Sequence, residues 1–203
     1  MFEINNKEIT SFKVNESLVY EIKDFYKYPD KVVDFINSTP ARFHKEGQKP
    51  THNGFFFEDK RHDFDMDELL EVYRFLSNIC DQKPADIKSF RTNIFKFLVP
   101  GFDRHQDHYW WPHIDLGYTG LVYLNKNSYP GTNLYRSTDS CPNGNEHFTP
   151  WISKNLFNVE FVLDADYNKL VLFDGLNTPH SMATTNDYFY DEYRINQVFF
   201  FES

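Results

Sequence analysis

The chain has 203 residues, a length that can bury a core within one domain without disulfides. Aromatic residues make up 19% of the chain and hydrophobic residues 40%, and this large aromatic share favours a β-rich core. The formal net charge of -9 argues against a nucleic-acid partner, and the lack of a long apolar run argues against a membrane span. Because the first residues are polar and the two cysteines lie far apart, we expect a cytoplasmic protein with reduced thiols.

Helical patterns come first along the chain. Residues 29–38 begin with a proline, which suits the first turn of a helix, and they carry apolar side chains on one side. A second helix can start at the capping residue Asp65 and must end before Pro84, with apolar residues at helical spacing between them. We therefore expect residues 1–90 to form a helical N-terminal flank.

Strand patterns follow, as short aromatic and β-branched runs separated by Pro, Gly, Asn and Asp. The expected strands are residues 92–99, 119–125, 132–137, 157–163, 169–175 and 193–202. Helices followed by a run of strands indicate an α+β protein, a sandwich or barrel backed by helices on one side. We expect a single domain over 1–203 with its β core at 91–203, and the connection from Ser137 to Trp151 is the expected substrate-binding loop.

Three residues in the β region have the side chains of a metal site. His113 and Asp115 are two positions apart, so on an extended chain their side chains point to the same face. His180 follows the strand expected at 169–175 and can supply a third ligand. Two imidazoles and one carboxylate leave coordination positions open, which is the ligand pattern of non-haem Fe(II) sites. The sequence therefore predicts an iron site made of His113, Asp115 and His180.

Arg194 lies at the start of the last expected strand, 14 residues after His180. Its planar guanidinium can bind the carboxylate of a co-substrate through two charge-assisted hydrogen bonds. Alternatively, Arg194 lies at the rim of the β core and pairs with Asp191 or Glu192. Together with the three upstream ligands, the co-substrate interpretation is favoured.

The order of these motifs resembles that of a known enzyme family. Over roughly residues 92–203, the chain resembles the Fe(II)- and 2-oxoglutarate-dependent oxygenases of the prolyl-hydroxylase type. The motifs that carry the resemblance are, in order, a His-x-Asp, a strand containing Tyr-Leu-Asn, a Gly-Thr turn, an Asn-Lys-Leu-Val-Leu-Phe strand, a Pro-His and then an Arg. The resemblance implies a double-stranded β-helix, or jelly-roll, core. It also implies iron bound by His113, Asp115 and His180, and 2-oxoglutarate bound through its distal carboxylate by Arg194 and Tyr123.

The activity implied by the resemblance is hydroxylation. Such a dioxygenase uses O₂ and 2-oxoglutarate, with ascorbate as a candidate reductant, and releases succinate and CO₂. Its substrate would be a peptidyl residue, an amino acid or a small metabolite, and the residues do not discriminate among these. The chain departs from the family pattern at Asn196, where relatives often have Ser or Thr, and Asn196 can donate a hydrogen bond to the co-substrate instead. The gap from His180 to Arg194 is also longer than usual.

Two other interpretations of these residues stay open. A second His-x-Asp, at His105 and Asp107, could join His113 in a zinc site for hydrolysis, although its polar surroundings favour a loop. A β-helix protein can also act as a non-catalytic binding or scaffold protein. In the favoured interpretation, Trp110 or Trp111 walls the metal pocket.

Overall fold

The computed structural model describes residues 1–5, 7–38, 53–57, 66–81, 89–97, 112–137, 157–183, 189 and 192–202. Its strands are β1 (Thr10–Val14), β2 (Ser17–Ile22), β3 (Asn53–Phe57), β4 (Ser89–Phe97), β5 (Tyr118–Tyr123), β6 (Tyr129–Ser137), β7 (Phe157–Ala165), β8 (Lys169–Asp174), β9 (His180–Met182) and β10 (Arg194–Glu202). Its helices are α1 (Pro29–Ser38) and α2 (Met66–Ile79).

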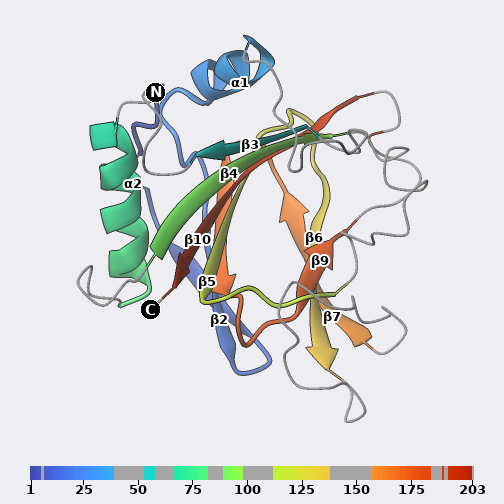
Figure 1. The fold of residues 1–203 in the computed structure, drawn as a ribbon. Helices are drawn as coiled ribbons and strands as arrows, with labels where there is room; N and C mark the ends of the chain where they lie inside the picture. Colours follow the sequence, from blue (N-terminus) through green and yellow to red (C-terminus); the bar gives the residue numbers. More distant parts are fainter. Residues whose placement is uncertain are drawn as a thin grey trace.

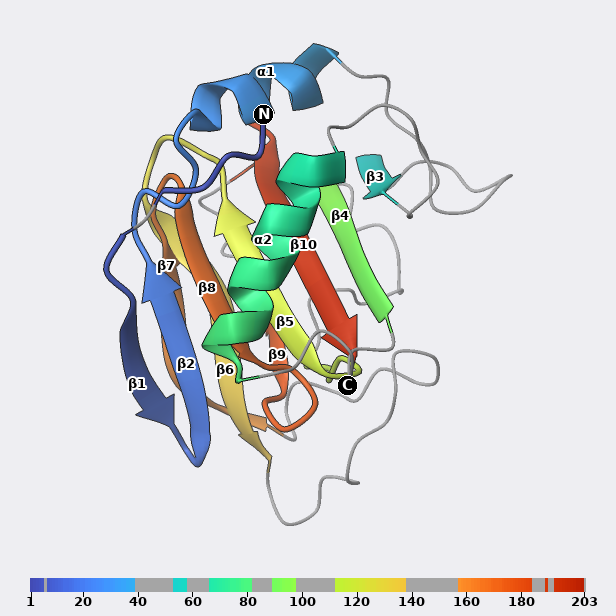
Figure 2. The ribbon, with the colours of Figure 1, turned by 90° about the vertical axis from the view of Figure 1, so that its left-hand side faces the viewer.

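The strands form two antiparallel sheets that lie face to face (Figure 1). Within the described residues, the larger sheet has seven strands in the order β1-β2-β8-β5-β10-β4-β3, and the smaller has three in the order β7-β6-β9. Helix α2 lies across the outer face of the larger sheet, and α1 lies near one end of it (Figure 2). The molecule is therefore layered as helices, larger sheet and smaller sheet.

The central strands of the larger sheet are buried on both faces. In β8, Leu170 and Leu172 pack with the helices, whereas Val171 and Phe173 pack toward the smaller sheet. Alternate residues of a strand face opposite sides, so a strand covered on both sides needs an unbroken apolar run. The space between the sheets is thus a second core, separate from the core under the helices.

Both helices bury one face against the larger sheet. Val32 and Ile36 of α1 are buried, as are Leu69, Val72 and Leu76 of α2. Residues three or four apart lie on the same side of a helix, which explains this spacing. Each such side chain contributes roughly 1.5–3 kcal/mol on burial, so packing on the sheet stabilises these helices more than their intrinsic propensity does.

The helices and the six expected strands are confirmed. Helix α1 has the expected bounds, α2 lies inside the expected range, and the strands correspond to β4, β5, β6, β7, β8 and β10. Antiparallel sheets with two helices agree with the α+β class. The proposed cap Asp65 lies outside the described residues.

Strands β1, β2, β3 and β9 were not predicted from the sequence. Because β2 pairs with β8 and β3 pairs with β4, residues before 90 contribute strands to the larger sheet as well as helices. The boundary expected at residue 90 therefore does not coincide with an edge of this sheet. In the described part of the chain, neither helix has the length and apolar character needed to cross a membrane.

Candidate metal centre

His113, Asp115 and His180 come together between the two sheets. One possible ligand atom from each lies within 4.8 Å of the others, and within the described residues they are the one group of this kind. The segment before β5 carries the first two, and β9 begins with the third. Backbone hydrogen bonds from His113 N to His180 O, at 3.0 Å, and from His180 N to His113 O, at 2.8 Å, hold the two segments in register. The predicted triad is therefore assembled by pairing of two segments distant in sequence.

The ligand atoms of this triad suit a cation. His180 Nδ1 lies 2.9 Å from the carbonyl oxygen of Thr178, which can only accept, so Nδ1 carries the hydrogen and Nε2 presents a lone pair. That Nε2 lies 3.1 Å from Asp115 Oδ2, and His113 Nε2 lies 4.0 Å from Asp115 Oδ1. An imidazole nitrogen and a carboxylate oxygen are both metal ligands, and at these distances one cation could bind all three side chains. The arrangement therefore fits the iron ion that the sequence predicts.

Neighbouring side chains fix the orientation of the triad. The Thr119 hydroxyl donates a hydrogen bond of 2.6 Å to Asp115 Oδ2, and Asp115 is only 4% exposed. The Phe173 ring stands edge-on to the His180 ring, with centroids 4.9 Å apart. A Cβ atom at Gly175 would lie 2.4 Å from Thr119 Oγ1, so the glycine leaves the room that the threonine needs. Carboxylate and imidazole are thus both held before any metal binds.

A second polar cluster is built around Arg194. Arg194 is 4% exposed, its Nη1 donates to Asn196 Oδ1 at 2.6 Å, and its Nη2 donates to the Gly131 carbonyl at 3.2 Å. Its Cζ lies 6.0 Å from the ring centre of Tyr123 and 5.8 Å from that of Tyr129. Arg194 and Asn196 alternate with residues of the helix-side core, so both side chains face the space between the sheets.

The Tyr123 hydroxyl joins the two sheets beside this arginine. Its oxygen lies 2.8 Å from Thr132 Oγ1 on β6, across the interior from β5. Burial raises the pKa of Tyr123, although the Thr132 hydrogen bond and the Arg194 charge oppose this shift. The phenol is therefore neutral at physiological pH and can donate a hydrogen bond to an anion.

The structure thus places all six predicted site residues in the interior or at its border. His113, Asp115 and His180 form one cluster, and Arg194, Tyr123 and Asn196 form the other. Arg194 is buried, which does not agree with the alternative position at the rim of the β core. Glu192, one of the two partners expected at the rim, is exposed. His105 and Asp107 of the alternative zinc cluster, Trp110, Trp111, Asp191 and the loop residues 138–151 lie outside the described residues.

Three contributors to the site were not identified from the sequence. They are Thr119, Thr132 and Gly131. Thr119 was missed because the chain bends at residues 116–117, with Gly117 at a φ of 93°, so alternation does not extend from Asp115 to Thr119. The others depend on the approach of β6 to β5 across the interior, which no pattern within one strand reveals.

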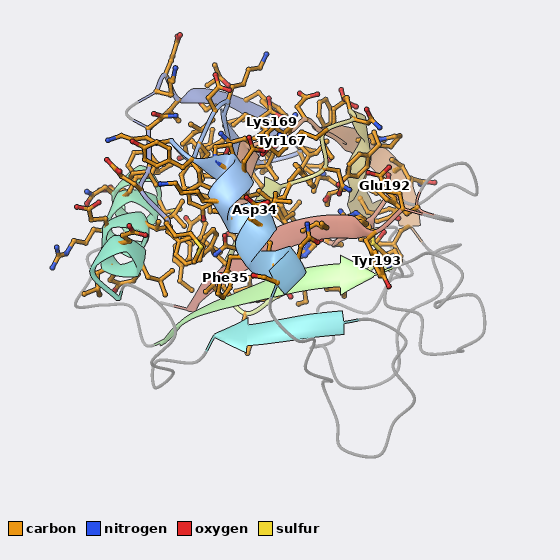
Figure 3. All side chains as sticks on the ribbon, turned by 90° about the horizontal axis from the view of Figure 1, so that it is seen from above. Asp34, Phe35, Tyr167, Lys169, Glu192 and Tyr193 are labelled. Atoms are coloured by element: carbon orange, nitrogen blue, oxygen red, sulfur yellow. The ribbon has the colours of Figure 1, made fainter. Side chains whose placement is uncertain are left out.

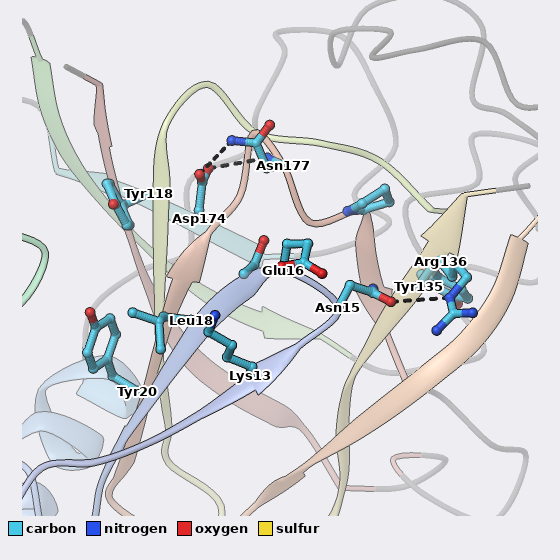
Figure 4. A pocket seen from close by; sticks show the side chains of 12 residues that line it. Lys13, Asn15, Glu16, Leu18, Tyr20, Tyr118, Tyr135, Arg136, Asp174 and Asn177 are labelled. Atoms are coloured by element: carbon cyan, nitrogen blue, oxygen red, sulfur yellow. Dashed lines mark hydrogen bonds between the residues drawn. The ribbon is translucent and has the colours of Figure 1, made fainter.

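A surface groove of about 650 Å³ lies apart from both clusters (Figure 4). It runs past the β1–β2 turn and is bordered by Tyr118, Asp174 and Pro179. In the figure, Asp174 is hydrogen-bonded to Asn177, and Asn15 to Arg136. None of the six predicted site residues lines it, so this groove is not the metal centre.

Comparisons with known proteins support the resemblance at the level of the fold. No family model and no curated protein sequence matches the chain. A prolyl-4-hydroxylase from Pseudomonas putida is similar in structure, with a TM-score of 0.51, 12% identity and 91% of each chain covered. An oxidoreductase of the 2OG-Fe(II) oxygenase family from Burkholderia pseudomallei has a TM-score of 0.54 and 11% identity, covering 91% of this chain and 84% of its own.

Proposed function

We propose that this protein is an Fe(II)- and 2-oxoglutarate-dependent dioxygenase that hydroxylates a peptidyl residue, an amino acid or a small metabolite. The observation that carries the proposal is the His113, Asp115 and His180 triad between the sheets, in a chain whose interior also contains a buried arginine. Similarity in fold to a prolyl-4-hydroxylase and to a member of the 2OG-Fe(II) oxygenase family supports it. We assign the two facing sheets to a double-stranded β-helix on the same grounds.

In this proposal the two clusters have different ligands. His113, Asp115 and His180 would hold Fe(II) on one side and leave its other positions open. Arg194, Tyr123 and Asn196 would bind the distal carboxylate of 2-oxoglutarate. When bound, iron supplies the oxidation of a substrate C–H bond by O₂, coupled to conversion of 2-oxoglutarate to succinate and CO₂.

The side chains of this protein orient the reactants and exclude water. A buried guanidinium offers two parallel N–H groups to a carboxylate, which fixes both the position and the direction of the co-substrate. The neutral Tyr123 hydroxyl can add a third hydrogen bond. The Thr119 hydroxyl orients Asp115, and the apolar side chains of the inter-sheet core exclude water from the same space.

Replacing a single ligand tests the proposal. The native protein, given Fe(II), 2-oxoglutarate and air, should form succinate slowly even without its substrate. His180→Ala should abolish this reaction, because two ligands remain and the metal loses most of its affinity. Succinate should be measured alongside circular dichroism, which reports whether the variant is folded.

His62→Ala is the matched control, because it removes an imidazole that belongs neither to the triad nor to the expected substrate-binding loop. It should form succinate at the native rate. A native protein that neither binds 2-oxoglutarate nor forms succinate would argue for a scaffold, and copurified zinc with hydrolytic activity would argue for a zinc enzyme. Full turnover by folded His180→Ala would refute the ligand assignment.

A further inference from the structure

Asn125 lies where the hydrogen-bonded ladder between β5 and β10 ends. The last regular contact is the hydrogen bond of 3.0 Å from Leu124 N to Ile195 O. Beyond it, the Asn125 side chain takes the place of a backbone peptide. Its Nδ2 donates to the Tyr193 carbonyl at 2.7 Å, and its Oδ1 accepts from the Ile195 N–H at 2.8 Å. The carboxamide therefore holds the main chain on both sides of Arg194.

The same carboxamide also holds an aromatic neighbour of the guanidinium. Tyr129 donates from its hydroxyl to Asn125 Oδ1 at 3.3 Å, and its ring centre lies 5.8 Å from Arg194 Cζ. The Phe189 ring in turn stands edge-on to the Tyr129 ring, with centroids 4.5 Å apart. Asn125 is 5% exposed, so water does not compete for these hydrogen bonds.

The two residues directly before Arg194 lie at the surface. Glu192 and Tyr193 lie at the outer end of β10, beside the end of β4 (Figure 3). Both are exposed, whereas Arg194 is 4% exposed. The chain thus passes from surface to interior within one residue, and Asn125 binds it at that step.

We propose that Asn125 is a positioning residue that sets the direction of Arg194, and through it the affinity for the distal carboxylate of 2-oxoglutarate. The inference rests on the proposed function, because it needs Arg194 to bind that carboxylate. A bidentate guanidinium must present both N–H groups in the plane of the carboxylate, so a small rotation of the strand start removes one hydrogen bond. Displacements of about 1 Å can cost up to ~100-fold in function.

Asn168 offers a matched control. Its carboxamide also forms two hydrogen bonds with the main chain, donating to the Tyr26 carbonyl at 2.8 Å and accepting from the Tyr26 N–H at 2.9 Å. Like Asn125 it is buried, but the main chain that its carboxamide binds precedes α1 rather than Arg194. Its backbone N–H donates to the Tyr123 carbonyl at 2.7 Å, a hydrogen bond that glycine at this position retains. Its φ of 60° favours glycine as the replacement, because glycine adopts this conformation without strain.

The test compares Asn125→Ala with Asn168→Gly in protein loaded with Mn(II), which occupies the metal site without turnover. Calorimetric titration with 2-oxoglutarate gives the co-substrate affinity, and electron paramagnetic resonance gives the affinity for Mn(II). For Asn125→Ala we expect the Kd of 2-oxoglutarate to rise at least ~tenfold while the Kd of Mn(II) stays unchanged. Asn168→Gly should change neither affinity. Hydrogen exchange at the Ile195 amide should accelerate in Asn125→Ala alone, because this amide loses its acceptor.

The outcomes separate this inference from the proposed function. If the native protein does not bind 2-oxoglutarate, the proposed function fails and the inference with it. If the native protein and Asn125→Ala bind 2-oxoglutarate equally well, only the inference is overturned. Equal losses of affinity in both variants would also overturn it, because the effect would then be general destabilisation. Should Asn125→Ala not fold, Asn125→Gln keeps the carboxamide but displaces it by one methylene, and the same loss is expected.

Discussion

At the scale of a single residue, Gly131 links Arg194 on the larger sheet to the smaller sheet. Its carbonyl accepts hydrogen bonds from Arg194 Nη2 at 3.2 Å and from Ala183 N at 3.1 Å. It also lies at an irregularity of β6, where the pairing with β7 shifts between Pro130 and Thr132. Such bulges redirect the backbone near functional sites. Here the redirected carbonyl reaches a guanidinium on the opposite sheet.

Gly131→Ala should impair both stability and co-substrate binding. A Cβ atom there would lie 2.8 Å from Tyr123 Cζ and 2.9 Å from the Leu163 carbonyl, and the backbone oxygen cannot move aside cheaply. Overpacking of this kind costs about 1–3 kcal/mol in the free energy of unfolding. Urea denaturation and 2-oxoglutarate titration measure the two effects.

Gly120→Ala is the control for this change. Its new Cβ atom would have its nearest neighbours at 3.5 Å, an ordinary van der Waals distance. We expect little change in either measurement. Comparable effects at both glycines would show that the loss at Gly131 is not caused by crowding of Tyr123.

The residues of the site were predictable wherever one strand carries them. His113 and Asp115 are two positions apart, and alternation on an extended chain places them on the same face, whereas Tyr123 was identified through the resemblance alone. Arg194 and Asn196 are related in the same way on β10. By contrast, the contact of Tyr123 with Thr132 joins two sheets, and it depends on how they approach each other. Alternation along one strand contains no information about that distance.

At the scale of elements, α2 covers the larger sheet, and Cys80, directly after the last residue of the helix, is buried with the same face. Cys80 is 6% exposed and belongs to the core under the helices. Burial raises the pKa of its thiol to about 12, and the nearby Asp174 charge adds to the shift. The thiol is therefore neutral and poorly reactive while the helix remains packed.

Cys80 should resist thiol reagents at pH 8 in the folded protein and react rapidly in urea. A Cys141→Ser background leaves Cys80 as the one remaining thiol, and a chromogenic disulfide reagent follows its labelling. The folded pKa lies above the ordinary value of 9.0, so the neutral thiol stabilises the fold below pH 9 and this contribution is lost between about pH 9 and 12. Rapid labelling without urea would contradict the burial of this helix end.

Elements with strong patterns were predictable, and short or atypical ones were not. The run at 170–173 identifies β8 because it is apolar on both faces. The β1–β2 hairpin turns through Asn15 and Glu16 rather than the usual Asn-Gly, with Asn15 at a φ of 53°. Strand β9 spans three residues and exists because β6 pairs with it. Such a strand is defined by its partner rather than by its own sequence.

At the scale of the whole molecule, the triad joins two parts of the fold. His113 and Asp115 precede β5 of the larger sheet, and His180 begins β9 of the smaller sheet. The Tyr123 and Thr132 hydroxyls connect the same two sheets further along β5. A metal ion at the triad would therefore link the sheets at one point, and a co-substrate beside Tyr123 and Arg194 would link them at another.

Metal binding should consequently raise the melting temperature of the protein. A ligand that binds only the folded state contributes about 2.7 kcal/mol at a concentration of 100 times its Kd. For a chain of this size each kcal/mol corresponds to about 2–4 °C, so Mn(II) should raise Tm by roughly 5–11 °C, with a further rise on adding 2-oxoglutarate. Scanning calorimetry with and without the ligands measures both steps.

The decisive part of this prediction is that stabilisation by 2-oxoglutarate depends on bound metal. If 2-oxoglutarate chelates the metal as well as binding Arg194, it should stabilise the protein far more with Mn(II) present than alone. His180→Ala should lose the metal step and most of the co-substrate step, whereas Asn125→Ala should lose only the second. An equal rise of Tm in His180→Ala would place the metal elsewhere on the chain, and the link between the two sheets would then not depend on the triad.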